Sequence, residues 1–202
     1  MHKDDPSPDK KGRGLKNLPE KQKSAQFDLF SSFYGEDQKH SNTIELWDSI
    51  PKFSCSKRKQ VTLRDENGRL PTWETEFVYK PQGSPEGIPA KMTIAPARVK
   101  LKDEEKDFLP SADEELIEEV LRKIFTDQQY GRHYVGDVTS FVDFTLGMIY
   151  RELKVWGHTR SLEQIKHSLD VMSGCHLTLH FQGSGRKAAY KGAIIPEMGV
   201  VA

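Results

Sequence analysis

Residues 145–192 constrain the fold more than any other part of the chain, because they describe two consecutive helices followed by a β-hairpin. Thr145 precedes a helical run that ends at Gly157, and Ser161 opens a second run that ends at Gly174. Ser161 and Gln164 have the spacing of a capping box, and Gly174 suits the left-handed position after a helix. One apolar stripe recurs along the second run at steps of three and four residues, formed by Leu162, Ile165, Leu169 and Met172. These signals predict a helix–turn–helix.

The segment after the second helix predicts a two-stranded wing. Residues 176–181 alternate polar and apolar side chains, residues 182–185 supply two glycines for a turn, and residues 186–195 continue as a second strand. His176, Thr178 and His180 are expected to share the outer face of the first strand, with the apolar residues between them facing the core. A helix pair with a wing places a helix or the wing against nucleic acid, or pairs with a second copy of itself.

The region before this module predicts β-hairpins and one further helix. Residues 60–64 and 72–80 are expected to pair through the turn 66–68, since Asn-Gly is a strong hairpin signal. Trp73, Phe77 and Tyr79 then form an aromatic face. Residues 91–101 predict another strand, with Pro96 favouring a sheet edge.

Residues 111–129 predict a helix that opens with a capping box (Ser111, Glu114) and buries Leu116, Val120, Leu121 and Ile124. A short strand is expected within residues 136–144. The predicted fold class is α+β, a winged helix with additional N-terminal β-hairpins.

Composition predicts a folded domain preceded by an arm. The chain has 202 residues, of which 36% are hydrophobic, and 30 basic residues balance 30 acidic ones, so nucleic-acid binding would depend on local patches. Residues 1–41 are expected to be a disordered arm with a short linear motif, and residues 42–202 the winged-helix domain. Two cysteines form no disulfide framework, and the sequence has no signal peptide or membrane-spanning run. We therefore expect a cytoplasmic protein without membrane contact.

Residues 42–190 resemble the plasmid replication initiators of the iteron-binding Rep group, in outline the TrfA type. The most specific part is a helix ending in Trp-Gly (156–157), followed by Arg-Ser (160–161) and an amphipathic helix. The resemblance implies a homodimer that binds double-stranded origin DNA and recruits host replication proteins. Such initiators carry two tandem winged helices: the first supports dimerisation and backbone contacts, and the second reads the iteron. The sequence stops at Ala202, after the first wing, so the second winged helix is not expected in this chain.

Six residues are the candidates for DNA contact. The exposed face of helix 161–173 should carry Glu163, Gln164, Lys166, His167 and Asp170, which together with Arg160 sum to zero formal charge. A helix that reads base edges normally has a basic background, so this helix is not expected to be a strong reader. The wing is more basic and suits phosphate contacts, which position a protein without specifying sequence. The predicted DNA-binding set is Arg160, Lys166, His167, Arg186, Lys187 and Lys191.

The pentapeptide Gln26, Phe27, Asp28, Leu29 and Phe30 is the sharpest short motif. It resembles the motif with which bacterial replication proteins dock on the sliding clamp, usually Gln-Leu-Ser/Asp-Leu-Phe, with Phe27 replacing the first Leu. A flexible arm would present Leu29 and Phe30 as apolar anchors, with Gln26 fixing orientation by hydrogen bonds. The alternative is that these aromatic residues fold back onto the core.

No other cluster predicts chemistry. A basic run (Lys52, Lys57, Arg58, Lys59) is either a DNA-backbone contact or a solvated face. His176 and His180 lack a third metal ligand, Gly183 and Gly185 lack a phosphate-loop frame, and Cys55 and Cys175 lack an activating context. The acid pairs at 114–115 and 118–119 are expected to face solvent. We therefore expect a non-enzyme with no catalytic residue, metal or cofactor. Two other functions stay open: a winged-helix transcriptional regulator, and a dimerisation module without DNA contact.

Overall fold

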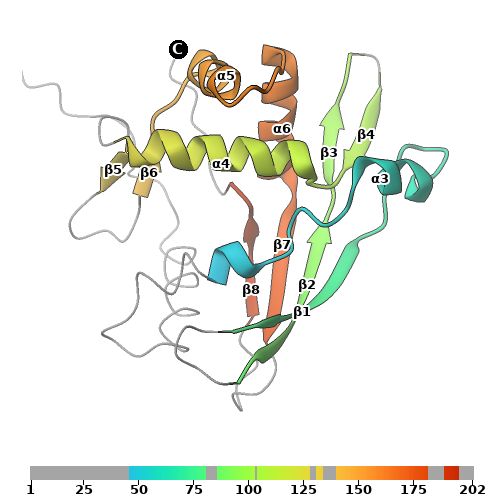
Figure 1. Ribbon diagram of the computed structural model, residues 1–202. Coiled ribbons are helices and arrows are strands. Elements are labelled where there is room, and N and C mark those ends of the chain that lie inside the picture. The colour runs from blue at the N-terminus through green and yellow to red at the C-terminus, as the bar shows by residue number, and fades with distance from the viewer. Residues whose placement is uncertain are drawn as a thin grey trace, which may run out of the picture.

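The computed structural model describes residues 46–80, 86–102, 104–127, 131–133, 140–181 and 189–195. Within them the chain forms a mixed α+β fold around a four-stranded antiparallel sheet of order β1-β2-β7-β8 (Figure 1). The sheet consists of β1 (Trp73–Tyr79), β2 (Ile88–Ala95), β7 (His176–Phe181) and β8 (Ala189–Ala193). Two further pairs are β3 (Ala97–Lys100) with β4 (Glu105–Phe108), and β5 (Gly131–His133) with β6 (Ser140–Val142). The helices are α3 (Lys57–Leu63), α4 (Ala112–Thr126), α5 (Leu146–Val155) and α6 (Leu162–Gly174), preceded by a helical turn at 46–49. The predicted α+β class is confirmed.

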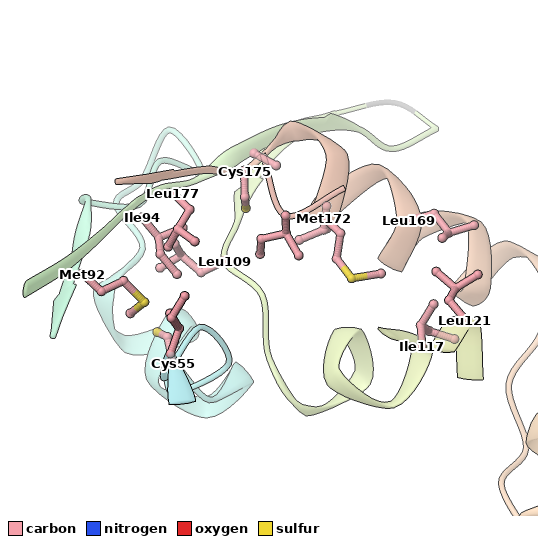
Figure 2. Close-up of a cluster of buried hydrophobic side chains, with 14 of the residues drawn as sticks. Cys55, Met92, Ile94, Leu109, Ile117, Leu121, Leu169, Met172, Cys175 and Leu177 are labelled. Carbon is pink, nitrogen blue, oxygen red and sulfur yellow. The ribbon is translucent and has the colours of Figure 1, made fainter. Parts of the chain in front are cut away.

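One hydrophobic core joins the inner face of the sheet to the helices. Alternate residues of the central strands point inward, so Met92 and Ile94 of β2 and Leu177 and Leu179 of β7 are almost completely buried. Figure 2 shows the core extending from these strands through Leu109 and Met172 to the helical residues Ile117, Leu121 and Leu169. The outward-facing His176, Thr178 and His180 alternate with this buried set, as predicted.

Helices α4, α5 and α6 pack against one another at one end of the sheet, and α6 leads directly into β7 (Figure 1). The predicted start signals of the last two helices are confirmed. The Thr145 hydroxyl accepts a hydrogen bond from the Met148 amide, and Ser161 and Gln164 form a reciprocal capping box. Gly157, with φ of +78°, ends α5 in the left-handed conformation that glycine adopts without strain. The two helices are therefore joined by a tight, glycine-dependent turn.

Two details of the α6 prediction are wrong. Leu162 was expected in the buried stripe with Ile165, Leu169 and Met172, but it lies at the first turn of the helix and is 49% exposed. Gly174 is the last helical residue and has no positive φ. Its lack of a side chain has another cause: a Cβ atom there would lie 2.8 Å from the Cβ atom of Ala97. The glycine therefore permits close packing of α6 on β3.

The predicted hairpin between residues 60–64 and 72–80 is wrong, because residues 57–63 form α3. Gln60 explains why this segment is helical rather than extended. Its buried side-chain amide donates hydrogen bonds to the Cys55 and Leu109 carbonyls and accepts one from the Leu109 backbone amide. The turn at Asn67 and Gly68 exists, with φ of +73° at Gly68, but it is closed by the Asp65 side chain and docks on β4 rather than joining two strands. The partner of β1 is β2.

The strand predicted over residues 91–101 is divided, since Pro96 separates β2 from β3. Its placement at a sheet edge is also wrong for β2, which is bonded to both β1 and β7. Proline marks the point where the chain leaves one sheet for the next pair of strands, which removes the need for a ladder hydrogen bond there. Trp73, Phe77 and Tyr79 share one face of β1, as predicted, and this face packs against the core.

Candidate nucleic-acid interface

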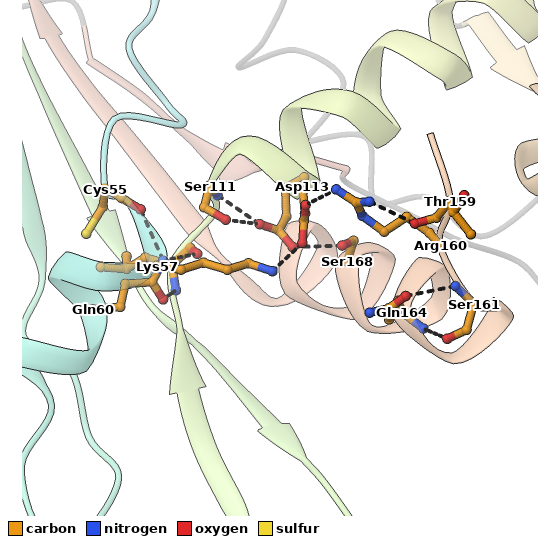
Figure 3. A network of polar contacts seen from close by, with 12 residues as sticks. Cys55, Lys57, Gln60, Ser111, Asp113, Thr159, Arg160, Ser161, Gln164 and Ser168 are labelled. Carbon is orange, nitrogen blue, oxygen red and sulfur yellow. Dashed lines mark hydrogen bonds and ion pairs between the residues drawn. The ribbon is translucent and has the colours of Figure 1, made fainter. Parts of the chain in front are cut away.

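A polar network fixes the turn between α5 and α6 against the start of α4 (Figure 3). The Arg160 guanidinium donates to Asp113 Oδ1 at 2.8 Å, and the Lys57 ammonium contacts the other carboxylate oxygen. Burial by itself would raise the pKa of Asp113, but hydrogen bonds from Lys57 and Arg160 outweigh it and hold that pKa below its usual value. The network thus joins α3, α4 and the helix–turn–helix through one ionised carboxylate.

A second carboxylate in this region is fully enclosed. Glu114 is 3% exposed; its Oε2 atom accepts hydrogen bonds from the Ser111 amide and hydroxyl, and its Oε1 atom accepts one from the Ser168 hydroxyl, all at 2.8 Å. The expectation that this acid faces solvent is wrong. The capping box at the start of α4 is confirmed, and its acid also bonds to α6. The buried face of α4 differs from the prediction at one position. Ile117 is buried, whereas Leu116, which was expected to be buried, is only partly buried.

The six predicted DNA-binding residues fall into three groups. Arg160 is committed to Asp113, and the His167 ring packs edge-on against Phe108 with 4.5 Å between ring centroids. Lys166 on α6 and Lys191 on β8 are exposed and form no side-chain hydrogen bond or ion pair with the described residues. Arg186 and Lys187 lie outside the described residues. Among the described candidates, two cations thus remain free to contact phosphates.

The basic run at 52–59 does not form one cationic patch. Lys52 is 3% exposed and pairs with Glu118 at 3.3 Å, an acid that also accepts a hydrogen bond from the Trp47 indole at 2.7 Å. Burial lowers the pKa of Lys52 although Glu118 opposes this effect. Lys59 lies over the Trp73 ring at 4.4 Å. Lys57 is bound to Asp113, so all three lysines make contacts within the domain.

Sequence reasoning missed an apolar corner beside the helix turn. Val155 and Trp156 at the end of α5 are 78% and 37% exposed, and Leu162 at the start of α6 is also exposed. Of these three residues, only Leu162 had a predicted position, in the buried stripe of α6. This corner lies at the same end of α6 as Arg160.

Sequence reasoning also missed a hollow on the outer face of the sheet. It has a volume of about 430 Å³ and is open to solvent. Its lining comes from β2, β7, β8 and the residue before β1: Thr72, Thr93, Ala95, His176, Thr178 and Lys191. The period-two alternation places each of these side chains outward, but only the strand order brings them together.

The described residues show no arrangement suited to catalysis by cysteine or to metal binding. Both cysteines are free and buried, and burial raises the pKa of Cys175 to about 12 and raises that of Cys55. No group of three or more metal-ligating side chains occurs among the described residues. Within the same residues, no helix combines the length and apolar character needed to cross a membrane.

The predicted arm 1–41, with the motif Gln26, Phe27, Asp28, Leu29 and Phe30, lies outside the described residues. Comparison of the chain with protein-family models, curated proteins and solved structures gave no match.

Proposed function

We propose that the chain is a winged-helix DNA-binding module of the plasmid replication initiator type. The observation that carries the proposal is the order of elements: α4, a short strand pair, α5, a tight turn, α6, and then the antiparallel pair β7–β8. This is the order of a winged helix, in which the second helix of the pair and the hairpin face nucleic acid. The network around Asp113 supports the proposal, since it holds the helix turn rigidly on the domain.

The distribution of charge supports weak, positioning contacts. Lys166 projects from α6 among Glu163 and Gln164, and Lys191 projects from β8. Arg160 and His167 are already engaged within the domain. With few free cations, the module neutralises few phosphates, so we expect modest duplex affinity with little sequence preference.

A salt titration of duplex binding tests this function. Each neutralised phosphate lowers log K by about 0.9 per decade of salt, so a shallow slope is expected. Lys166→Gln should weaken binding and reduce the slope by about one contact. Lys100→Gln, on the exposed face of β3, is the matched control and should leave binding unchanged. Tight, sequence-selective binding at physiological salt, or equal loss in both variants, would overturn the assignment.

Recruitment of a bacterial sliding clamp is the second part of the proposal, supported by the motif at 26–30. A peptide of residues 21–34 should bind the clamp without the domain. Replacing Leu29 and Phe30 by Ala should abolish binding, since anchor residues cost about 2 kcal/mol or more each. The double replacement should leave the melting temperature of the full chain unchanged. The core-anchor alternative predicts instead that the peptide does not bind and that the double replacement lowers the melting temperature. A clear stability loss with unchanged clamp binding would count against the clamp proposal.

A further inference from the structure

The outer face of the four-stranded sheet concentrates hydrogen-bond donors. Two cross-strand rows meet at the hollow: Thr93, Thr178 and Lys191 are register partners across β2, β7 and β8, and Ala95 pairs with His176 in the next row. Thr72 lines the same hollow from the chain before β1. Ala95, in the second row, has the smallest side chain of the six, which leaves space beside His176. The result is a concave surface with three hydroxyls, an imidazole and an ammonium around it.

This surface has donors without acceptors of comparable charge. None of the described residues that line the hollow is a carboxylate. The nearest acid in the register is Glu74, the partner of Thr93, and it is paired with Lys91 at 2.7 Å. Within the described part of the chain, the side chains of Lys191, Thr93 and Thr178 form no hydrogen bond or ion pair. A cation and hydroxyls arranged in this way match the oxygens of a tetrahedral anion, which accept several hydrogen bonds at once.

We propose that this hollow is a phosphate-binding site, in which Lys191 supplies charge and the hydroxyls of Thr93 and Thr178 donate hydrogen bonds. Thr72 and His176 are also part of the lining. The phosphate group comes either from a free phosphate ester or from a nucleic-acid backbone, because both present the same oxygens. The site shares Lys191 with the duplex contacts proposed above, whereas its other residues lie on the sheet side rather than on α6.

Amide chemical shifts of the full chain during titration with inorganic phosphate, at constant ionic strength set with chloride, test the proposal. Saturable shifts are expected at residues 93, 178 and 191. Lys191→Gln and Thr178→Val should each weaken binding about ten-fold, the effect of losing one good charge-assisted hydrogen bond. Both positions are on an uncovered sheet face, and valine keeps the β-branched shape of threonine, so the melting temperature should be unchanged. Lys100→Gln on β3 is the control. Shifts that grow linearly without saturation, or saturable binding that survives Lys191→Gln, would overturn the site.

Two further titrations identify the source of the phosphate. A single-stranded oligonucleotide that shifts the same amides at lower concentration than inorganic phosphate, and loses this effect in Lys191→Gln, identifies the nucleic-acid backbone. Tighter binding of a phosphate monoester such as glycerol phosphate identifies a small phosphate ester. Lys166→Gln separates this site from the proposed duplex contact, because it should weaken duplex binding and leave phosphate binding intact. Duplex binding that does not respond to Lys166→Gln, with the phosphate shifts intact, therefore counts against the proposed function only. Absence of saturable phosphate shifts in a chain whose duplex binding depends on Lys166 counts against this site only.

Discussion

The pair between Arg160 and Asp113 should contribute measurable stability, because it attaches the helix turn to α4. A double-mutant cycle with Arg160→Met and Asp113→Asn isolates its energy. Methionine keeps the apolar stem of arginine, and asparagine keeps the size of aspartate. The coupling lies between two limits. Hydrogen bonds to charged groups contribute about 1.5–3 kcal/mol, whereas solvent-exposed ion pairs contribute about 0.2–1 kcal/mol. The two side chains are 29% and 26% exposed, with 2.8 Å between donor and acceptor, so we expect a coupling of about 1 kcal/mol.

The coupling should also depend on pH in a defined direction. The pKa of Asp113 is lower in the folded chain than its ordinary value of 3.8. A carboxyl with a depressed folded pKa contributes stability that is complete above the unfolded pKa and is lost as pH falls through the folded pKa. The cycle should therefore give its full coupling near neutral pH and a progressively smaller one below about pH 4.

Urea denaturation of the four proteins at two pH values is the assay. At neutral pH the single variants should each lower the free energy of unfolding by about 1 kcal/mol. The exposed pair Lys123–Asp127 on α4 is the matched control and should show a smaller coupling. A coupling below about 0.3 kcal/mol, the usual error of additivity, would refute the role assigned to this contact. So would a coupling that persists unchanged at acid pH.

Three other predictions concern glycines and cysteines. Gly157→Ala should destabilise the chain by about 1–2 kcal/mol in urea denaturation, because its φ is +78° while space around it is open. Gly174→Ala should also destabilise the chain, by about 1–3 kcal/mol, because the new methyl group overlaps Ala97. This effect should outweigh the higher helix propensity of alanine. A neutral result would show that α6 can shift on β3. Cys55 and Cys175 should react with a thiol reagent at pH 8 only after denaturant is added, since both are buried with raised pKa values; fast labelling of the native protein would contradict this.

The parts of the fold that sequence predicts well are those encoded by neighbouring residues. The capping boxes at Ser111 and Ser161 need only a residue three positions later, and both form. The alternation over 176–181 needs only one buried face, and it gives β7. These signals are local, so no knowledge of the rest of the fold is required to interpret them.

Two of the failures share one cause, a distant partner that overrides a local preference. The segment around Gln60 has β-forming residues and an Asn-Gly signal after it. Its helix is fixed by hydrogen bonds between Gln60 and the backbone of Leu109, 49 residues away. Glu114 looks like a solvent-facing acid until Ser168 of α6 is placed beside it. Local secondary-structure propensity predicts the structure poorly where a buried polar group needs a specific hydrogen-bond partner.

The same cause limits how a nucleic-acid surface can be predicted from charges in a sequence. Arg160 and Lys57 count as cations in the sequence, yet both are bound to Asp113, which is 47 and 56 residues away from them. Lys191 does not stand out in the sequence either, but its register partner is Thr178 rather than an acid, so its charge stays available. In a chain with equal numbers of acidic and basic residues, a positive surface exists only where folding has left a cation without an acid. The strand register, more than the density of basic residues, is therefore the basis on which we propose where this protein binds a phosphate.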